Sequence, residues 1–262
     1  MTPRSNLRRN LCSLTHLGTL LAFASCAGAA RHDSNVVAGL ALTPVRVAEP
    51  DTIVFRRTVT RDGVDSSTGT RTVVRRVTRE GAGLRFLEVE QRFPAAGGEI
   101  IDTAIAELAT LRAVAHRSHQ PQRTMLFTFD SAQAQGTVTS RSAGEARVEN
   151  VRQDTGGLIF DSNIIDLVVA ALPLRPGFSA TLPFFIYERG GRVPMPVTVQ
   201  EQGSAGFQDL GQREVWVVSV GVPGAPATVW VDRRTREVLR VRYDIAARNM
   251  SFTDDRITPL GQ

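Results

Sequence analysis

Apolar residues recur at every second position along most of the chain from Asp51 onward. Ile53, Phe55 and Val59 alternate with polar neighbours, for example, before Asp62-Gly63 ends the run. Similar runs follow, separated by turn residues about every ten positions, which is typical of antiparallel strands with one buried face. The pattern predicts about a dozen strands between residues 51 and 257.

One stretch departs from this alternation. Residues 160–177, which read FDSNIIDLVVAALPLRPG, predict a short helix that Asp161 or Ser162 caps and that Pro173 ends. Apolar side chains cover most of the helix circumference, so the helix must be buried or must face an apolar ligand or membrane. Two interpretations remain open, a helix packed in the core and a lid over an apolar cavity.

The strands and the helix belong to one domain by this pattern, because no Pro-rich or Ser-rich linker and no long repeat divides residues 51–257. A single sheet of this size must curve or fold over to bury a face. We predict a mainly β fold, a single large curved antiparallel sheet (a half-barrel) closed by one short helix. Residues 99–111 fit a strand or a helix, and the flanking strands favour a strand. In the C-terminal hairpin the alternation places Leu239, Val241, Tyr243 and Ile245 on one face.

Residues 1–25 have the pattern of a signal peptide. A basic start precedes the apolar run 11–24, and small residues follow. The run is shorter than the about 20 apolar residues that span a bilayer. We expect residues 26–50, which show little periodicity, to form a flexible tether.

The leader ends in Ala24-Ser25-Cys26-Ala27, which resembles the lipobox of bacterial lipoproteins. The resemblance implies lipidation of Cys26, and the alternative is cleavage after Ala29. We expect an exported protein, either lipid-anchored at the periplasmic face of the outer membrane or soluble in the periplasm. In the lipidated case, membrane attachment runs through the N-terminus.

Charge adds little to this picture. All 31 basic residues are arginine, and Arg4, Arg8 and Arg9 lie in the leader, so 28 arginines face 26 acidic residues in the remaining chain. No basic run with interleaved aromatic residues marks a nucleic-acid surface, so no nucleic acid is expected as a partner. Arginines at alternate strand positions are expected on solvated faces and exposed edges.

The sequence predicts neither a catalytic nor a metal site. Cys12 and Cys26 are the only cysteines, so the domain lacks a disulfide and a thiol nucleophile. His116 and His119 would lie on opposite faces of a strand, and a zinc site usually needs three or four protein ligands. No nucleophile elbow, HExxH motif, P-loop or dinucleotide fingerprint is present, and no cofactor is expected. The acidic candidates have structural interpretations: strand-end polarity for Asp102, helix capping for Asp161, and a solvated turn for Asp254-Asp255.

Three segments resemble a bacterial exported family of unknown function, DUF3108. They are TLRAVAH at 110–116, the helical stretch 160–177, and VWVDRRTREVLRVRYD at 229–244. That family is similar in style to the carrier and receptor proteins of outer-membrane lipoprotein sorting. The resemblance implies a curved half-barrel whose concave apolar side is closed by a helix, with 164–172 as the lid.

We therefore expect a non-enzymatic cell-envelope protein that binds a lipid or another apolar ligand on the concave face. One alternative is a structural or assembly factor that holds an unknown protein partner and has no ligand cavity. A second alternative is a hydrolase of an envelope polymer. Candidate cavity and lid residues are Ile164, Ile165, Val168, Leu172, Phe127, Phe129, Phe184, Trp216, Trp230 and Tyr243.

Overall fold

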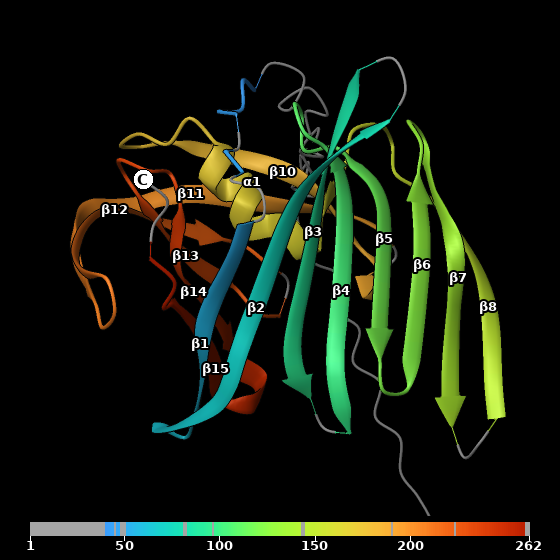
Figure 1. Cartoon of the computed structure of the whole chain (residues 1–262), viewed down its shortest axis with the longest axis horizontal. Helices are drawn as coiled ribbons and strands as arrows, with labels where there is room; N and C mark the ends of the chain where they lie inside the picture. Colours follow the sequence, from blue (N-terminus) through green and yellow to red (C-terminus); the bar gives the residue numbers. More distant parts are fainter. Residues whose placement is uncertain are drawn as a thin grey trace, which may run out of the picture. The chain divides into compact units, whose positions relative to one another are not determined.

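One sheet of 15 strands curves around a short helix, α1, on its concave side (Figure 1). The structure is a computed structural model that describes residues 40–44, 46–47, 51–80, 83–95, 97–142, 145–189, 191–222 and 224–259. The strands are β1 (Asp51–Arg61), β2 (Val64–Glu80), β3 (Leu84–Ala95), β4 (Gly98–Glu107), β5 (Ala113–Gln120), β6 (Arg123–Phe129), β7 (Gln133–Ser142), β8 (Glu145–Asp154), β9 (Phe160–Asp161), β10 (Ser179–Ile186), β11 (Gly191–Phe207), β12 (Gly211–Val220), β13 (Ala227–Asp232), β14 (Val238–Ile245) and β15 (Met250–Arg256). The helix α1 spans Ile165–Ala171, and short 3-10 turns cover Ser162–Ile164, Tyr187–Arg189 and Ala246–Arg248.

The strand order is β8-β7-β6-β5-β4-β3-β2-β1-β15-β14-β13-β12-β11-β10-β9. The first and last strands, β1 and β15, pair at the centre, and each half of the chain runs outward from them as a meander. All neighbours are antiparallel except β9 and β10, which pair in parallel. The prediction of one mainly β, curved sheet with one short helix is confirmed, although the sheet has more strands than predicted and contains one parallel pair. The segment 99–111 supplies the strand β4, as the flanking pattern favoured.

The sheet is rolled, so that one end lies inside the curve of the other. Phe184 and Phe185 are successive residues of β10 and therefore point to opposite faces. Phe184 belongs to the main core, whereas Phe185 stacks edge-on against Phe127 and Phe129 of β6, with ring centroids 5.3 and 4.9 Å apart. The register β4–β5–β6 puts Phe127 on the same face as Ala104 of the main core. Hence the outer face of β10 packs on the inner face of β6.

The helix begins and ends where the sequence predicts. The Asp161 side chain accepts a hydrogen bond from the Asn163 backbone N–H at 2.9 Å, which caps a 3-10 turn before α1. Leu172 leaves the helix with an extended conformation because the ring of Pro173 disfavours helical geometry at the preceding residue. The capped body is therefore short, with seven α-helical residues.

The interior of the roll is a continuous apolar core with α1 in its middle. Val168, Val169 and Leu172 are fully buried, and the core also contains inward-facing side chains of most strands. The segment before β1 packs on the same core: its Leu40, Leu42 and Val47 side chains contact the core, and the Thr43 N–H donates to the Ala171 carbonyl at 2.7 Å. The described residues 40–44 and 46–47 therefore lie near the C-terminal end of α1.

A bulge in β14 changes one predicted face. The register between β13 and β14 shifts between Trp230 and Val231, which pair with Arg240 and Val238. Leu239 is the extra residue, and it packs with Phe207 and Val217 on the opposite face from Val241. The prediction that Leu239 shares a face with Val241 is wrong, because the added residue reverses the alternation.

Candidate functional site

The first turn of α1 is joined to the sheet by a buried ionic network. Arg71 on β2 contacts Asp166 of α1 at 3.2 Å and Asp254 of β15 at 3.1 Å, and Arg57 of β1 binds the same Asp254 at 2.7 Å. Burial alone would lower the pKa of Arg71, but the Asp254 and Asp166 carboxylates raise it. The pKa of the adjacent Tyr243 hydroxyl is raised by burial. Two arginines and two aspartates thus balance one another at this point.

Asp254 shows that the expected solvated turn at Asp254-Asp255 is wrong. Both residues belong to β15, and the side chain of Asp254 is 1% exposed. Asp255, on the other face, pairs with Arg240. The strand continues through both acids because each of them meets an arginine on its own face.

A second polar cluster lies where the two ends of the sheet overlap. His116 Nδ1 of β5 lies 2.9 Å from Asp161 Oδ2 of β9, and Asn163 approaches the same ring nitrogen at 3.5 Å. Burial raises the pKa of Asp102, although a hydrogen bond from Ser118 opposes this shift. Asp161 therefore caps the 3-10 turn that leads into α1 and also binds His116. Asp102 lies in the same region, where the two ends of the sheet overlap.

The candidate cavity residues fall into separate environments. Main-core positions within or around α1 are occupied by Ile164, Ile165, Val168, Leu172, Phe184 and Trp216, with Tyr243 partly buried against them. Phe127 and Phe129 belong instead to a separate apolar cluster, which also contains Phe185 and lies where the two ends of the sheet overlap. Trp230 lies on the convex face with Phe207 and Leu239, which corrects the expectation that it lines the concave side. The residues of the helix contact the protein's own core.

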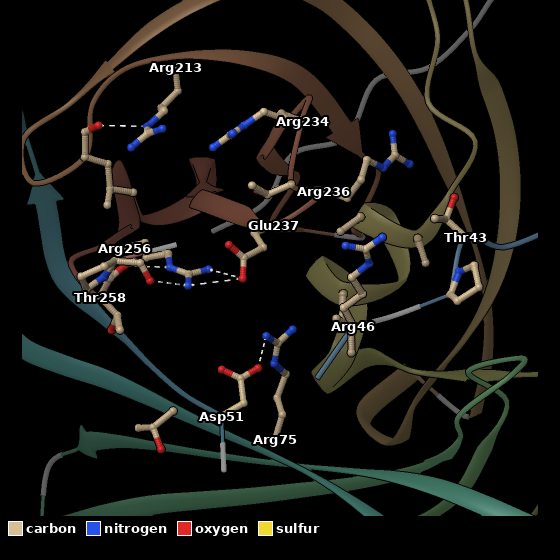
Figure 2. A pocket seen from close by; sticks show the side chains of 18 of the residues that line it. Thr43, Arg46, Asp51, Arg75, Arg213, Arg234, Arg236, Glu237, Arg256 and Thr258 are labelled. Carbon is tan, nitrogen blue, oxygen red and sulfur yellow. Dashed lines mark hydrogen bonds and ion pairs between the residues drawn. The ribbon is translucent and has the colours of Figure 1, made fainter. Parts of the chain in front are cut away.

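A polar cleft lies beside the C-terminal half of α1. Its volume is about 1060 Å³. We call it the arginine cleft, because six arginines from different parts of the chain surround it (Figure 2). Its apolar floor comes from α1 and from Leu210. The lining arginines and acids are Arg46, Arg75, Arg213, Arg234, Arg236, Arg256, Asp51, Asp209 and Glu237, and the lining α1 residues are Leu167, Ala170 and Ala171.

Five sections of the chain bring these arginines together. Arg75 comes from β2, Arg213 from β12, Arg256 from β15, and Arg46 from the segment before β1. Arg234 and Arg236 come from the turn between β13 and β14, in which Arg236 has a positive φ of 63°. A hydrogen bond from Arg236 Nη2 to the Leu172 carbonyl places this cation at the C-terminal end of α1, where the helix dipole favours it.

A smaller cleft of about 660 Å³ adjoins the arginine cleft, and Arg213, Arg234 and Arg236 line both. Its other lining residues include Leu174 and Trp216. The Arg233 guanidinium lies over the Trp216 ring at 5.0 Å. The shared arginines make one continuous basic surface from the two clefts.

The arginine cleft is not evident from the sequence, because alternate arginines on strands are expected on solvated faces. The sequence of β2 contains one indication, because Arg71 and Arg75 are each two residues away from Val73. On a strand, all three side chains therefore point to the same face. Both arginines and Val73 are buried. Nothing comparable in the local pattern marks Arg234 or Arg236, which lie in a turn.

The remaining predictions concern the histidines, a metal site and a membrane span. His116 points inward and His119 outward from β5, as expected for a strand. Among the described residues, no group of three or more His, Cys, Asp or Glu side chains is placed to hold a metal ion. In the same part of the chain no helix has the length and apolar character needed to cross a membrane. Cys26 and the leader lie outside the described residues.

Fold and cleft define an open, rolled β-sheet protein with an internal helix and a basic cleft beside it. The chain belongs to the DUF3108 family of proteins of unknown function, whose model matches residues 52–253, and this confirms the predicted family. No curated protein matches the sequence.

Two solved structures are similar to the chain at 10% identity. One is a β-barrel-like protein of the DUF1849 family from Brucella abortus, with a TM-score of 0.49 over 83% of this chain and 98% of the other. The second is a DUF1329 family protein from Desulfovibrio piger, with a TM-score of 0.26 over 80% of this chain and 85% of the other.

Proposed function

We propose that this protein is a non-enzymatic cell-envelope protein, anchored through a lipidated Cys26, that binds a lipid or a similar amphiphile. The observation that carries the proposal is the arginine cleft, which is lined both by arginines and by apolar side chains of α1 and Leu210. An amphiphile needs both surfaces, a polar one for its head group and an apolar one for its chain. The ligand therefore binds beside α1 and not beneath it.

The packing of α1 supports this position. Val168 and Val169 have no exposed surface, so the space beneath the helix is filled by the protein's own side chains. Leu167, Ala170 and Ala171 on the other side line the cleft. Ligand sites of a few hundred to about 1,000 Å³ are usual for small molecules, and the arginine cleft is at the upper end of that range.

Native mass spectrometry tests the proposal on protein purified without a delipidating step. We expect co-purifying lipid in the wild type and at least a two-fold loss of lipid in Leu210→Ser, which removes apolar surface from the floor. Leu126→Ser serves as the control, because Leu126 is 49% exposed and lies outside the cleft. Lipid-free spectra of the wild type, under conditions that preserve the cargo of a known lipid carrier, would rule out lipid binding.

The anchor has its own test. Labelling with palmitate compares the wild type with Cys26→Ser, and we expect the label in the wild type alone. Equal labelling of both proteins would exclude lipidation at Cys26.

The filled interior also favours a second candidate, an envelope structural or assembly factor that binds a protein partner. In that case the curved sheet serves as a rigid scaffold, and the core around α1 stabilises it. Lipid-free protein with an unaltered fold would favour this candidate over the first.

A further inference from the structure

Positive charge exceeds negative charge around the arginine cleft. Six arginines line it against three carboxylates, and each carboxylate already has an arginine partner. Asp51 pairs with Arg75, Glu237 pairs with Arg256 at 3.4 Å, and Asp209 pairs with Arg56, which lies outside the lining. The described acids therefore leave several lining arginines without a counter-charge.

Two of the cleft arginines are buried. Arg75 is 7% exposed, and its Nε has no hydrogen-bond partner among the described residues. Arg256 is 3% exposed, and its Nη1 has only the ion pair with Glu237 at 3.4 Å in the same part of the chain. Arg236 Nε, like Arg75 Nε, has no hydrogen-bond partner there. A buried N–H without an acceptor costs free energy, and the cost is larger for a charged group. Arg75 Nε and Arg236 Nε therefore lack an acceptor among the described residues, and an external anion would supply the missing negative charge.

The effect of burial on the cleft arginines points in the same direction. The pKa of Arg256 is lowered by burial and further by the charge of Arg75, while Glu237 only partly opposes the shift. Burial also lowers the pKa of Arg236. An anion held between these side chains would reverse both effects, because it supplies opposite charge within a partly buried space.

We propose that the arginine cleft is a binding site for a phosphate group, held between Arg75, Arg236 and Arg256. The inference deepens the proposed function, since it assigns the polar group of the ligand, and it rests on the same cleft. A phosphate offers several acceptor oxygens in different directions, which suits guanidinium groups that arrive from separate strands. Exposed Arg46 and Arg234 line the same cleft and add long-range attraction. The group can belong to a free phosphate or to a lipid head group.

Isothermal titration calorimetry on the full-length protein tests the site at about 0.15 M salt, where exposed charges are screened. The probes are inorganic phosphate and a soluble short-chain phosphatidic acid. Two variants weaken the site: Arg75→Gln within it, and the double variant Arg46→Gln/Arg234→Gln, whose exposed positions keep the fold intact. Arg76→Gln is the matched control, because Arg76 neighbours Arg75 on β2 but is 49% exposed and pairs with Glu88 on the other face.

We expect both probes to bind the wild type, with affinity reduced at least ten-fold in Arg75→Gln and at least three-fold in the double variant. Arg76→Gln should stay within two-fold of the wild type. No binding of either probe by the wild type, or equal affinity in all four proteins, would overturn the assignment.

The two probes also separate the sources of the phosphate and the two proposals. Tighter binding of the phosphatidic acid than of inorganic phosphate assigns a lipid head group, and equal binding assigns a free phosphate. Phosphate binding at Arg75 in a protein that never carries lipid supports the site while removing the lipid function. If lipid co-purifies but the affinity for both phosphate probes is unchanged in every arginine variant, the lipid function is supported and the phosphate site is ruled out.

Discussion

Arginines are buried in two regions around α1, and their partners differ. Beside the first turn of the helix, Arg57 and Arg71 meet Asp254 and Asp166, so the charges balance within the protein. Beside its C-terminal end, Arg75, Arg236 and Arg256 face only two partner carboxylates, Asp51 and Glu237, and the Nε groups of Arg75 and Arg236 have no hydrogen-bond partner among the described residues. The first group connects the helix to the sheet. The second group has the composition of a site that an external anion completes.

The largest effect is expected when the balanced network loses its shared acid. Asp254→Asn should lower the free energy of unfolding by about 3–5 kcal/mol, because Arg57 then loses its carboxylate partner and Arg71 keeps only Asp166. Urea denaturation measures the change. Asp255→Asn on the same strand is the control, with an expected loss under about 1 kcal/mol for its more exposed pair with Arg240. Similar losses in both variants would contradict a special role for the network.

A smaller loss is expected from the one cleft arginine that also contacts the helix end. Arg236→Met removes the hydrogen bond to the Leu172 carbonyl and a cation near the negative end of the helix dipole. We expect a loss of about 1 kcal/mol in the free energy of unfolding. The measurement is urea denaturation in a buffer without phosphate. An unchanged stability would show that Arg236 is in the cleft for its ligand alone.

The region where the two ends of the sheet overlap contains an acid in place of an arginine as the unsatisfied group. Its carboxylate is partly buried, and one of its oxygens accepts no hydrogen bond from the described residues. Asp102 Oδ1 has no hydrogen-bond partner among the described residues, and burial raises the pKa of this carboxyl. Its contribution to stability is therefore present below the ordinary carboxyl pKa and is lost as the pH rises through the raised value. Asp102→Asn, which stays neutral, should raise Tm at pH 7 by about 2 °C, a change typical of ~1 kcal/mol in a domain of this size.

The gain from Asp102→Asn should shrink as the pH falls towards 4, and differential scanning calorimetry at several pH values follows it. Ser118 still has an oxygen to bond in the variant. A gain that is constant across this range would contradict the assignment to the charge of Asp102.

The smallest effect is expected at the exposed rim of the cleft. Arg46→Gln should change the free energy of unfolding by less than about 0.5 kcal/mol, because surface substitutions without a partner have little effect. The same variant should weaken phosphate binding. A large loss of stability would show that Arg46 belongs with the structural arginines.

Much of the fold follows from local pattern. Alternation along β1, β6 and β14 predicts strands, and Asp161 and Pro173 set the ends of the helical stretch. The pattern also places Arg75 on the face of Val73. It fails at Leu239, where a single bulged residue reverses the alternation, and at Asp254, whose arginine partners come from other strands.

The candidate site was predicted less well, because a cleft depends on contacts between distant parts of the chain. Local alternation assigns each side chain to one of two faces, but it does not say which strand will lie opposite. Arg75 and Arg256 meet only because β1 joins β2 to β15 at the centre of the sheet. Trp230 shows the same limit, since its aromatic ring suggested a cavity and its register puts it on the convex face.

The sequence by itself determined the strand-rich architecture, the position of the helical stretch between Asp161 and Pro173, and the membership of the family. These properties depend on backbone preferences and on the burial of apolar side chains, which act over short stretches. The tertiary structure alone decided that the sheet rolls over its own end, that α1 is enclosed by core, and which buried arginines have a carboxylate in reach. Electrostatic balance depends on distance in space, and only the folded chain sets that distance.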